Sequence, residues 1–327
     1  MIAERSAEKI KMDKRMLLII NPRSGKTKRK EMFSSIENVL SEAGWEIDTV
    51  YTEHRGHATE IAEKAADYDR IVCVGGDGTL SEVYNGLMKL EKRPEVGYVP
   101  AGSTNDFAKG IGLPASYKKS AALAASDKVY PIDVGSFTAD GNEPKFFSYV
   151  ASFGMFTRIS YSTAQDVKNK FGHMAYIFEG IKSIADLESY KPFRLRVETE
   201  DTILEQEYIF GAISNSTSLG GVVKLDKKHV HVDDGLFELI LIRKPKNFVE
   251  IGDTVGQLMK KRYRADRIVF THTDKIKLTS LTPLEWTLDG EYAGKVSSVE
   301  LEVKGGALAF VRPKGVRRKP FLRKKKP

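Results

Sequence analysis

Cysteine is scarce in this sequence, since Cys73 is the only one among 327 residues. A single cysteine excludes a disulfide within the chain and is typical of a reducing cytoplasm. Long apolar runs are missing too: stretches such as Met16–Ile20 and Leu239–Ile242 are far shorter than the roughly 20 residues that a membrane helix needs. Met1–Arg15 lacks the apolar segment of a signal peptide, and Met12 is an alternative start. These absences predict a cytoplasmic protein without a membrane-spanning segment.

Several common site signatures are missing as well. The histidines and the cysteine form no cluster with the spacing of a zinc site. The glycine-rich loop Gly75–Thr79 matches neither the G-x-x-x-x-G-K-[ST] pattern of P-loop ATPases nor the G-x-G-x-x-G pattern of dinucleotide-binding proteins. A zinc protein, a P-loop ATPase and a dinucleotide-dependent dehydrogenase are therefore not the first interpretations.

The formal charge of +8 is concentrated at the C-terminal end of the chain. Residues 314–327 form a basic tail without acidic residues, and the remainder is close to neutral. Such a run is commonly a solvated, disordered end, and the alternative is attraction to an anionic surface. We also expect residues 1–15 to be a flexible N-terminal extension. The basic residues of the tail are Lys314, Arg317, Arg318, Lys319, Arg323, Lys324, Lys325 and Lys326.

What the sequence does contain is a glycine-rich loop between a strand and a helix. Ile71–Val74 is an unbroken apolar run, typical of a strand buried on both faces, and Leu80–Met88 has apolar residues at helical spacing. The backbone N–H groups of Gly75–Thr79 and the N-terminus of the helix predict a phosphate site. Asp77 within this loop implies a divalent cation between its carboxylate and the phosphates. The alternative is a simple turn in which Asp77 caps the helix.

Two further loops follow strands in the same half of the chain. Asn21–Lys26 follows Met16–Ile20, and Ala101–Phe107 follows Val96–Pro100. Strands alternate with helices over residues 16–134, which predicts a doubly wound, Rossmann-like α/β domain with ligands beyond the carboxyl ends of its strands. Taken alone, each loop is equally well explained as a capped turn. We expect a domain boundary near Gly135, and the segment at about 305–313 is a candidate to return to this first domain.

The second half, residues 135–304, is rich in strands. Many of them alternate apolar and polar residues, which favours antiparallel sheets with one face toward water. Helices are expected near His173–Leu187 and Asn247–Lys260, so we predict a β-sandwich with helical insertions. The expected strands are Phe146–Phe153, Phe193–Thr199, Ile203–Ser214, Leu236–Ile242, Arg267–Thr271, Lys275–Thr279, Glu285–Leu288 and Val299–Val303.

Loops and acidic motifs follow one another along the chain in a recognisable order. They are Asn21–Gly25, Gly75–Thr79, Gly102–Asp106, Asp133, Asp233-Asp234-Gly235 and Asp289-Gly290-Glu291. Together they resemble the diacylglycerol kinase catalytic-domain family, from about Met16 to Val311, and most of all its soluble bacterial members. The resemblance implies an α/β fold of two domains like that of NAD kinases and diacylglycerol kinases, with a C-terminal β-sandwich that holds the lipid site.

In that family the matching loops bind ATP. Ser103 stands where the family usually has threonine, which keeps the hydroxyl, and Ser81 stands where asparagine is usual. The resemblance implies the following ATP-binding residues: Asn21, Pro22, Arg23, Ser24, Gly25, Thr52, Gly75, Gly76, Asp77, Gly78, Thr79, Leu80, Ser81, Ser103 and Asp106.

The family's Asp-Gly-Glu motif faces the γ-phosphate. The resemblance therefore implies that Glu291 is the general base that takes the proton from the attacking hydroxyl, and that Asp289 supports it or the metal. In isolation, an Asp-Gly pair between two strands is more often a hairpin turn.

The resemblance also implies Mg²⁺ in two roles. A structural ion is expected at Asp234, with the backbone carbonyls of His231 and Leu236. Relatives carry Pro-x-Ala just upstream, where this chain has Leu225–Lys228, so His231 is the weakest match and a plain turn is an equal alternative. Three aspartates resemble those that connect this site to the nucleotide Mg²⁺ through water, namely Asp77, Asp106 and Asp133.

These motifs imply an ATP-dependent kinase that phosphorylates diacylglycerol or a related lipid to give phosphatidic acid. One rival is a kinase for another substrate on the same fold, such as a sphingoid lipid, NAD or a sugar phosphate. The other is a non-enzymatic nucleic-acid-binding protein with a basic tail. The Asp-Gly-Glu motif and the Asn-Asp-Phe turn argue against a soluble kinase for NAD or a sugar phosphate and against the nucleic-acid-binding protein. They do not identify the lipid, because acyl-chain pockets are lined by generic apolar side chains. The expected partners are the lipid substrate and anionic phospholipid at the inner face of the membrane; a homodimer stays open, and nucleic acid is not expected.

Overall fold

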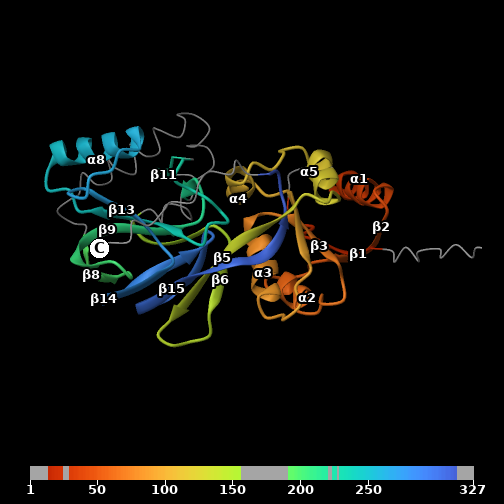
Figure 1. The fold of residues 1–327 in the computed structure, drawn as a ribbon, viewed down its shortest axis with the longest axis horizontal. Helices are drawn as coiled ribbons and strands as arrows, with labels where there is room; N and C mark the ends of the chain where they lie inside the picture. Colours follow the sequence, from red (N-terminus) through yellow and green to blue (C-terminus); the bar gives the residue numbers. More distant parts are fainter. Residues whose placement is uncertain (1–13, 25–28, 156–190, 220–222, 227, 315–327) are drawn as a thin grey trace, which may run out of the picture.

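The computed structural model describes residues 14–24, 29–155, 191–219, 223–226 and 228–314 (Figure 1). Four features of the sequence analysis lie wholly or largely outside these ranges: residues 1–13 of the expected N-terminal extension, Gly25, the helix expected near His173–Leu187, and all of the basic tail except Lys314. No helix in the described part of the chain combines the length and the apolar character needed to span a bilayer.

The first half is built on a parallel sheet, as its buried apolar runs predict. Its strands are β1 (Lys14–Ile20), β2 (Trp45–Tyr51), β3 (Arg70–Gly75) and β4 (Glu95–Pro100). They lie in the order β2-β1-β3-β4, with every neighbouring pair parallel. The predicted parallel sheet is therefore confirmed, and the carboxyl ends of these strands meet at one edge.

Helices cover both faces of this sheet (Figure 1). Helices α1 and α5 pack with one set of alternate strand residues, and α2 and α3 pack with the other set. This arrangement is the doubly wound one, because successive side chains of a strand point to opposite faces. The helices are α1 (Arg29–Glu42), α2 (His57–Ala62), α3 (Asp77–Leu87), α4 (Asp106–Gly110) and α5 (Tyr117–Ala124).

Two long strands run through both halves of the molecule. Strand β5 (Val129–Ala139) pairs antiparallel with β15 (Glu291–Val311), and the last part of β15 also lies parallel to β4, with Phe310 beside Val96. The boundary expected near Gly135 falls inside β5. The sheet of the first half therefore receives its last neighbour from the C-terminal end of the chain.

The second half curls around its own apolar core. Trp286 lies at its centre, fully buried, with its ring 5.2 Å from Phe137 and 4.8 Å from Phe153. The elements are β6 (Lys145–Phe147), β7 (Val150–Gly154), β8 (Phe193–Glu198), β9 (Ile203–Ser214), β10 (Ser218–Leu219), β11 (Val223–Lys224), β12 (Phe237–Arg243), α8 (Phe248–Lys260), β13 (Ile268–Thr273) and β14 (Lys275–Leu288).

Most expected strands of this half are present, but three boundaries were wrong. Phe146–Phe153 is two strands, because the carboxylate of Asp289 takes the N–H groups of Ser148 and Tyr149 that a continuous ladder would use. The two short strands expected over 275–288 form the single strand β14, and the one expected at 299–303 is part of the much longer β15. The helix expected over Asn247–Lys260 is confirmed as α8, with Asn247 as its N-cap.

Candidate active site

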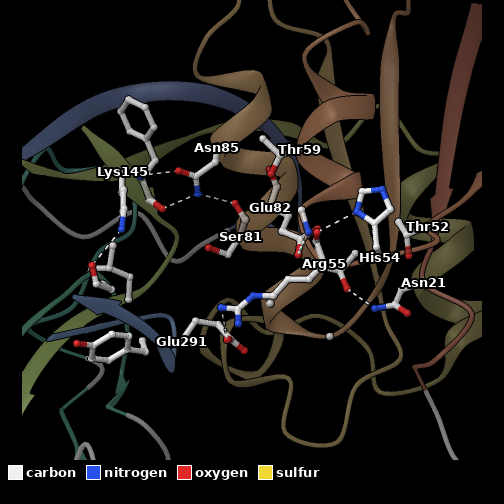
Figure 2. A pocket seen from close by; sticks show the side chains of 18 of the residues that line it. Asn21, Thr52, His54, Arg55, Thr59, Ser81, Glu82, Asn85, Lys145 and Glu291 are labelled. Carbon is white, nitrogen blue, oxygen red and sulfur yellow. Dashed lines mark hydrogen bonds and ion pairs between the residues drawn. The ribbon is translucent and has the colours of Figure 1, made fainter. Parts of the chain in front are cut away.

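A cavity of about 940 Å³ lies between the two halves (Figure 2). Its walls come from the loops after β1, β2 and β3, from the first turns of α3, from β6, and from the turn between β14 and β15. Nine of the predicted site residues line it: Asn21, Arg23, Ser24, Thr52, Gly76, Gly78, Thr79, Ser81 and Glu291.

The glycine loop is held tightly against the loop after β1. The side-chain amide of Asn21 donates to the hydroxyl of Thr79 at 2.9 Å, and the N–H of Asn21 donates to Val74 at the end of β3. A Cβ atom on Gly75 would lie only 2.7 Å from the side chain of Thr79, which no real side chain tolerates. Glycine is therefore required where the strand turns into helix α3, and backbone groups are left close to the cavity.

The third loop packs directly against the glycine loop. A Cβ atom on Gly102 would lie 2.6 Å from the Cα of Gly76, so the two backbones touch. The side chain of Asn105 closes this loop on itself: its oxygen accepts from the N–H of Gly102, and its amide donates to the Gly102 carbonyl. Asn105 has a φ of 50°, a left-handed conformation that asparagine tolerates better than most residues. The structure thus brings together loops that are far apart in the sequence.

Asp77 connects these two loops through its carboxylate. Its oxygens accept from the N–H groups of Asp106 and Phe107, at 2.9 and 3.3 Å, which are in the first turn of α4. The pKa of Asp77 is raised from 3.8 to about 6, chiefly by burial and also by the nearby carboxylates of Asp106 and Asp289, against the lowering effect of these hydrogen bonds. The alternative in which Asp77 caps its own helix is wrong, because Gly76 is the N-cap residue of α3 and Asp77 lies in the first turn.

Glu291 reaches the glycine loop from the second half of the molecule. One carboxylate oxygen, Oε1, lies 3.6 Å from where a Cβ atom on Gly78 would be, which is van der Waals contact and places the carboxylate next to the glycine loop. The other oxygen, Oε2, accepts from Arg55 at 2.9 Å across the cavity (Figure 2). Both side chains are more than half exposed, so this ion pair is easily broken. An acidic side chain with an accessible oxygen is therefore beside the predicted phosphate loop.

Asp289, two residues earlier, is entirely different in its surroundings. It is buried, and its carboxylate accepts from the N–H groups of Ser148, Tyr149 and Val150 and from the Ser148 hydroxyl. Burial raises its pKa, and these four hydrogen bonds counteract the increase. Asp289 also has a φ of 49°, which places it in the turn that leads into β15. The side chain fixes the position of this turn, and with it the position of Glu291.

Several polar residues at the cavity were not anticipated from the sequence, among them Arg55, Glu82 and Asn85. Asn85 joins the two halves: its amide donates to the carbonyls of Ser81 and Phe146, and its oxygen accepts from the N–H of Phe146 (Figure 2). Glu82 accepts from the N–H groups of Gly56 and Ala58 and so holds the loop that carries Arg55. For Asn85, the signal available in the sequence was its spacing: it follows Ser81 by four positions and so lies on the same side of α3, one turn later.

The second acidic group of the sequence analysis lies where β5, β15 and the turn before β12 meet. Asp133 accepts from the N–H groups of Gly235 and Gly306, both at 2.7 Å, where the register between β5 and β15 shifts. Asp234 accepts from the N–H of Leu236 at 3.1 Å. Burial raises the pKa of both carboxyl groups. Repulsion from neighbouring acidic residues also raises both pKa values, whereas the backbone hydrogen bonds lower them. For Asp234, attraction to His231 lowers the pKa as well.

The remaining predicted residues are more loosely related to the cavity. The side chain of Leu80 is buried in the apolar core rather than beside the nucleotide loop. Asp77, Ser103 and Asp106, which were predicted to bind ATP, do not line the 940 Å³ cavity. Gly75 supports the loop from below, through its contact with Thr79.

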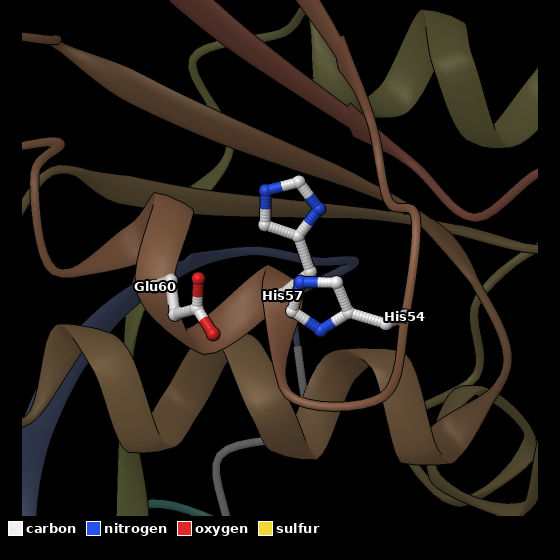
Figure 3. Close-up of side chains that lie close together, drawn as sticks. All are labelled: His54, His57 and Glu60. Carbon is white, nitrogen blue, oxygen red and sulfur yellow. The ribbon is translucent and has the colours of Figure 1, made fainter.

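One cluster near the cavity has residue types that bind metals. Ligand atoms of His54, His57 and Glu60 lie within 4.8 Å of one another (Figure 3). However, the Nδ1 atom of His57 accepts from the N–H of Glu53, so the neutral ring carries its proton on Nε2 and has no second lone pair to offer. The rings of His54 and His57 also stack, 4.8 Å apart. We therefore assign no metal to this cluster.

Two family models match the chain. Residues 15–137 match the diacylglycerol kinase catalytic domain, and residues 150–312 match a C-terminal domain described as NAD kinase beta sandwich-like. A diacylglycerol kinase of Bacillus subtilis is 30% identical over 86% of this chain and 91% of its own length. A diacylglycerol kinase of Staphylococcus haemolyticus is 31% identical over 88% of this chain and 85% of its own length.

Solved structures have the same fold. The crystal structure of a diacylglycerol kinase from Bacillus anthracis superimposes with a TM-score of 0.72 over 94% of this chain and all of its own, at 22% sequence identity. The two-domain fold of α/β domain and β-sandwich predicted from the sequence is thereby confirmed. The chain belongs to the diacylglycerol kinase family. Kinases of this family use ATP as the phosphate donor.

Proposed function

We propose that the protein transfers the γ-phosphate of ATP to the hydroxyl group of diacylglycerol or a related lipid, giving phosphatidic acid. The observation that carries this proposal is the approach of Glu291, from the second half, to Gly78 in the glycine loop of the first half. A base beside a phosphate loop, in a cavity shared by two domains, is the arrangement that phosphoryl transfer to a hydroxyl requires.

The nucleotide occupies the cavity along the loops after β1, β2 and β3 in this proposal. The close packing of Gly75 on Thr79 and of Gly76 on Gly102 supports it, because contacts this close need residues without side chains and hold the backbone of the glycine loop in place beside the cavity. Asn21 holds the hydroxyl of Thr79, and Thr52 is fixed by its N–H bond to Ile20.

Glu291 is the proposed general base. Its carboxylate takes the proton of the lipid hydroxyl while the hydroxyl oxygen bonds to the γ-phosphorus; the bond between γ-phosphorus and the bridging oxygen breaks, and ADP leaves. Asp289 is a positioning residue in this scheme, since all its hydrogen bonds go to the segment Ser148–Val150 that anchors the turn.

Mg²⁺ fits the acidic groups near the loop. Burial, together with repulsion from the carboxylates of Asp106 and Asp289, raises the pKa of Asp77, and a divalent cation bound with ATP would relieve that repulsion. When bound, the ion neutralises charge on the transferring phosphate. A second, structural ion at Asp234 with the carbonyls of His231 and Leu236, and a supporting role for Asp133, are parts of the same proposal; the oxygen-rich turn at Asp233–Gly235 supports them.

The acceptor would be met at the inner face of the membrane, with the protein in the cytoplasm. The basic tail is proposed to bind anionic phospholipid there, through attraction of about 1 kcal/mol for each basic residue near the surface.

The decisive experiment uses the purified full-length chain with radiolabelled ATP and Mg²⁺. The acceptors are diacylglycerol, sphingosine, NAD and a sugar phosphate, and the products are separated by chromatography. Label in phosphatidic acid is the expected result. Label in NAD or the sugar phosphate alone would contradict the lipid assignment. No transfer to any acceptor, together with binding to nucleic acid at physiological salt, would favour the non-enzymatic rival.

A further inference from the structure

Helix α8 presents an uncharged, apolar stripe to solvent. Phe248 is 76% exposed, Val249 82% and Met259 56%. Gly252 and Gly256 lie between them on the same side, and a Cβ atom on either glycine would meet no heavy atom within 4 Å. Side chains three, four, seven and eight positions apart share one side of a helix, so these residues form a continuous outer surface. We call Phe248, Val249, Gly252, Gly256 and Met259 the α8 outer stripe.

The other side of the same helix is occupied by the protein. Thr254, Val255 and Gln257 are buried, and Leu258 packs against the main apolar core. The helix is therefore firmly seated, at the end of the molecule opposite to α1 (Figure 1). Phe248 nevertheless stays exposed to solvent, although the opposite side of the same helix is buried.

The acidic residues of α8 are neutralised by partners within the fold. Glu250 pairs with Arg267 at 3.0 Å, and Asp253 pairs with Arg264 at 2.6 Å. Neither carboxylate is part of the outer stripe. An approaching anionic surface is thus not repelled by uncompensated negative charge on this helix.

Basic side chains flank both ends of the stripe. Lys246 is exposed just before Phe248, and Lys260 and Arg262 are exposed just after Met259. Over residues 243–267 the chain has eight basic and three acidic residues. An apolar side between two groups of lysine and arginine is the pattern of a helix that lies in the surface of an anionic bilayer.

We propose that α8 docks the folded protein on an anionic lipid bilayer, with Phe248 and Val249 inserted among the lipids and the flanking lysines at the head groups. This inference rests on the proposed function, because a kinase whose acceptor is a membrane lipid has to stay at the bilayer surface. It differs from attraction through the C-terminal tail: α8 supplies apolar insertion at a defined place on the fold, which persists when salt screens the charges.

Tryptophan fluorescence allows a direct test of this proposal, because the native tryptophans give only a constant background. Trp45 and Trp286 are both buried, so they report little of what happens at the surface. A tryptophan introduced as Phe248→Trp keeps an aromatic side chain in the stripe and makes it fluorescent. The matched control is Leu281→Trp, which introduces the same group at a position that is 82% exposed on a different element, β14.

Vesicles of phosphatidylcholine and phosphatidylglycerol are added to each variant in the absence of ATP. We expect the Phe248→Trp emission to shift to the blue and to be quenched by brominated lipid, and the Leu281→Trp emission to stay unchanged. At 0.5 M salt, the protein that still sediments with vesicles should show the same shift and quenching. An unchanged Phe248→Trp spectrum while the protein sediments with vesicles would overturn the proposal. Equal shifts in both variants would also overturn it, because contact would then not be localised to α8.

A second measurement separates the bilayer from a second copy of the chain. Phe248→Ser combined with Val249→Ser should weaken vesicle binding at least tenfold, because two inserted apolar side chains are lost. Turnover of detergent-solubilised diacylglycerol should stay unchanged, which distinguishes failure of docking from failure of the proposed function. If light scattering shows a dimer that this double variant turns into a monomer with vesicle binding unaltered, the stripe is a dimer interface and the proposal is wrong.

Discussion

The carboxylate of Glu291 is the residue on which the proposed chemistry depends most. Replacing it with glutamine keeps the size of the side chain and its contact with Arg55 but removes the ability to accept a proton. We expect Glu291→Gln to lower kcat by about 10²–10⁴, the usual contribution of a positioned general base, with little change in the KM for ATP. Steady-state kinetics with detergent-solubilised diacylglycerol measure both constants.

The matched control for this variant is Glu300→Gln, an exposed glutamate further along β15 that pairs only weakly with Lys275 and Lys277. It should leave kcat unchanged. A loss of less than about tenfold in Glu291→Gln would show that another group accepts the proton.

The raised pKa of Asp77 predicts how the stability of the folded protein depends on pH. Its pKa is raised from the ordinary value of 3.8 to about 6, so in the absence of Mg²⁺ the protonated form favours the folded state. That stabilisation is complete below about pH 3.8 and is lost as the pH rises through about 6. Asparagine carries no charge, so the stability of Asp77→Asn relative to wild type should rise between about pH 4 and 6, by at most about 3 kcal/mol.

Denaturant unfolding in EDTA at several pH values tests this dependence. Kinase activity of Asp77→Asn should nevertheless fall below about 1% of wild type, because the charge proposed to hold the cation is gone. Asp67→Asn, at an exposed carboxylate of the same domain, is the control and should retain full activity. A variant at Asp77 with normal activity would contradict the role of the glycine loop.

Residue identity alone was a good guide to which loops meet, and a poor guide to what each acid does. The Gly75–Thr79 loop and Glu291 lie together as the motifs imply, because parallel strands end at one edge and β14 turns back beside them. The resemblance gave Glu291 and Asp289 different roles, but nothing local in the sequence showed that Asp289 is buried while Glu291 is exposed. The difference depends on Ser148 and Val150, whose N–H groups come from a segment about 140 residues away.

At the scale of elements, the contact between the two phosphate loops can be tested with a single methyl group. Gly102→Ala would put its Cβ 2.6 Å from the Cα of Gly76, so the loops have to separate. Overpacking of this kind costs about 1–3 kcal/mol. We expect a lower midpoint of unfolding and a raised KM for ATP, with a smaller effect on kcat.

Gly252→Ala is the control for that substitution. Its Cβ would meet nothing within 4 Å, and in the middle of α8 alanine should stabilise the helix by about 0.5–1 kcal/mol. Destabilisation by both substitutions would mean that the effect at Gly102 is not due to the close approach of the loops.

Elements were predicted well where periodicity decides them and less well where distant partners do. Strand β8 alternates buried and exposed residues as Phe193–Val197 suggests. The split between β6 and β7 depends on one buried carboxylate from another part of the chain, and β14 continues through residues that look like a turn, Leu281–Pro283. Such features have no local signal, because they are decided by pairing across the sheet.

For the whole molecule, the basic tail leads to a prediction that is independent of α8. Deleting Val316–Pro327, a segment outside the described residues, should raise the KM for lipid on anionic vesicles at least tenfold, because seven of the eight basic charges of the tail are removed. Turnover of detergent-solubilised lipid should not change, and added salt should mimic the deletion in the full-length chain. Equal vesicle binding by both forms at low salt would return the tail to a merely solubilising role.

The pairing of β15 with β4 also has a consequence for how the protein is made. The side chain of Arg93, just before β4, donates to the carbonyl of Ala307, which is 214 positions later in the chain. While the ribosome is still translating the second half, the first domain therefore has its four parallel strands but an open edge at β4, and Glu291 has not been synthesised. An open edge invites pairing with other chains. A nascent chain or a product of premature termination should accordingly depend on chaperones, and phosphoryl transfer can begin only after the last strand has left the ribosome and closed the sheet.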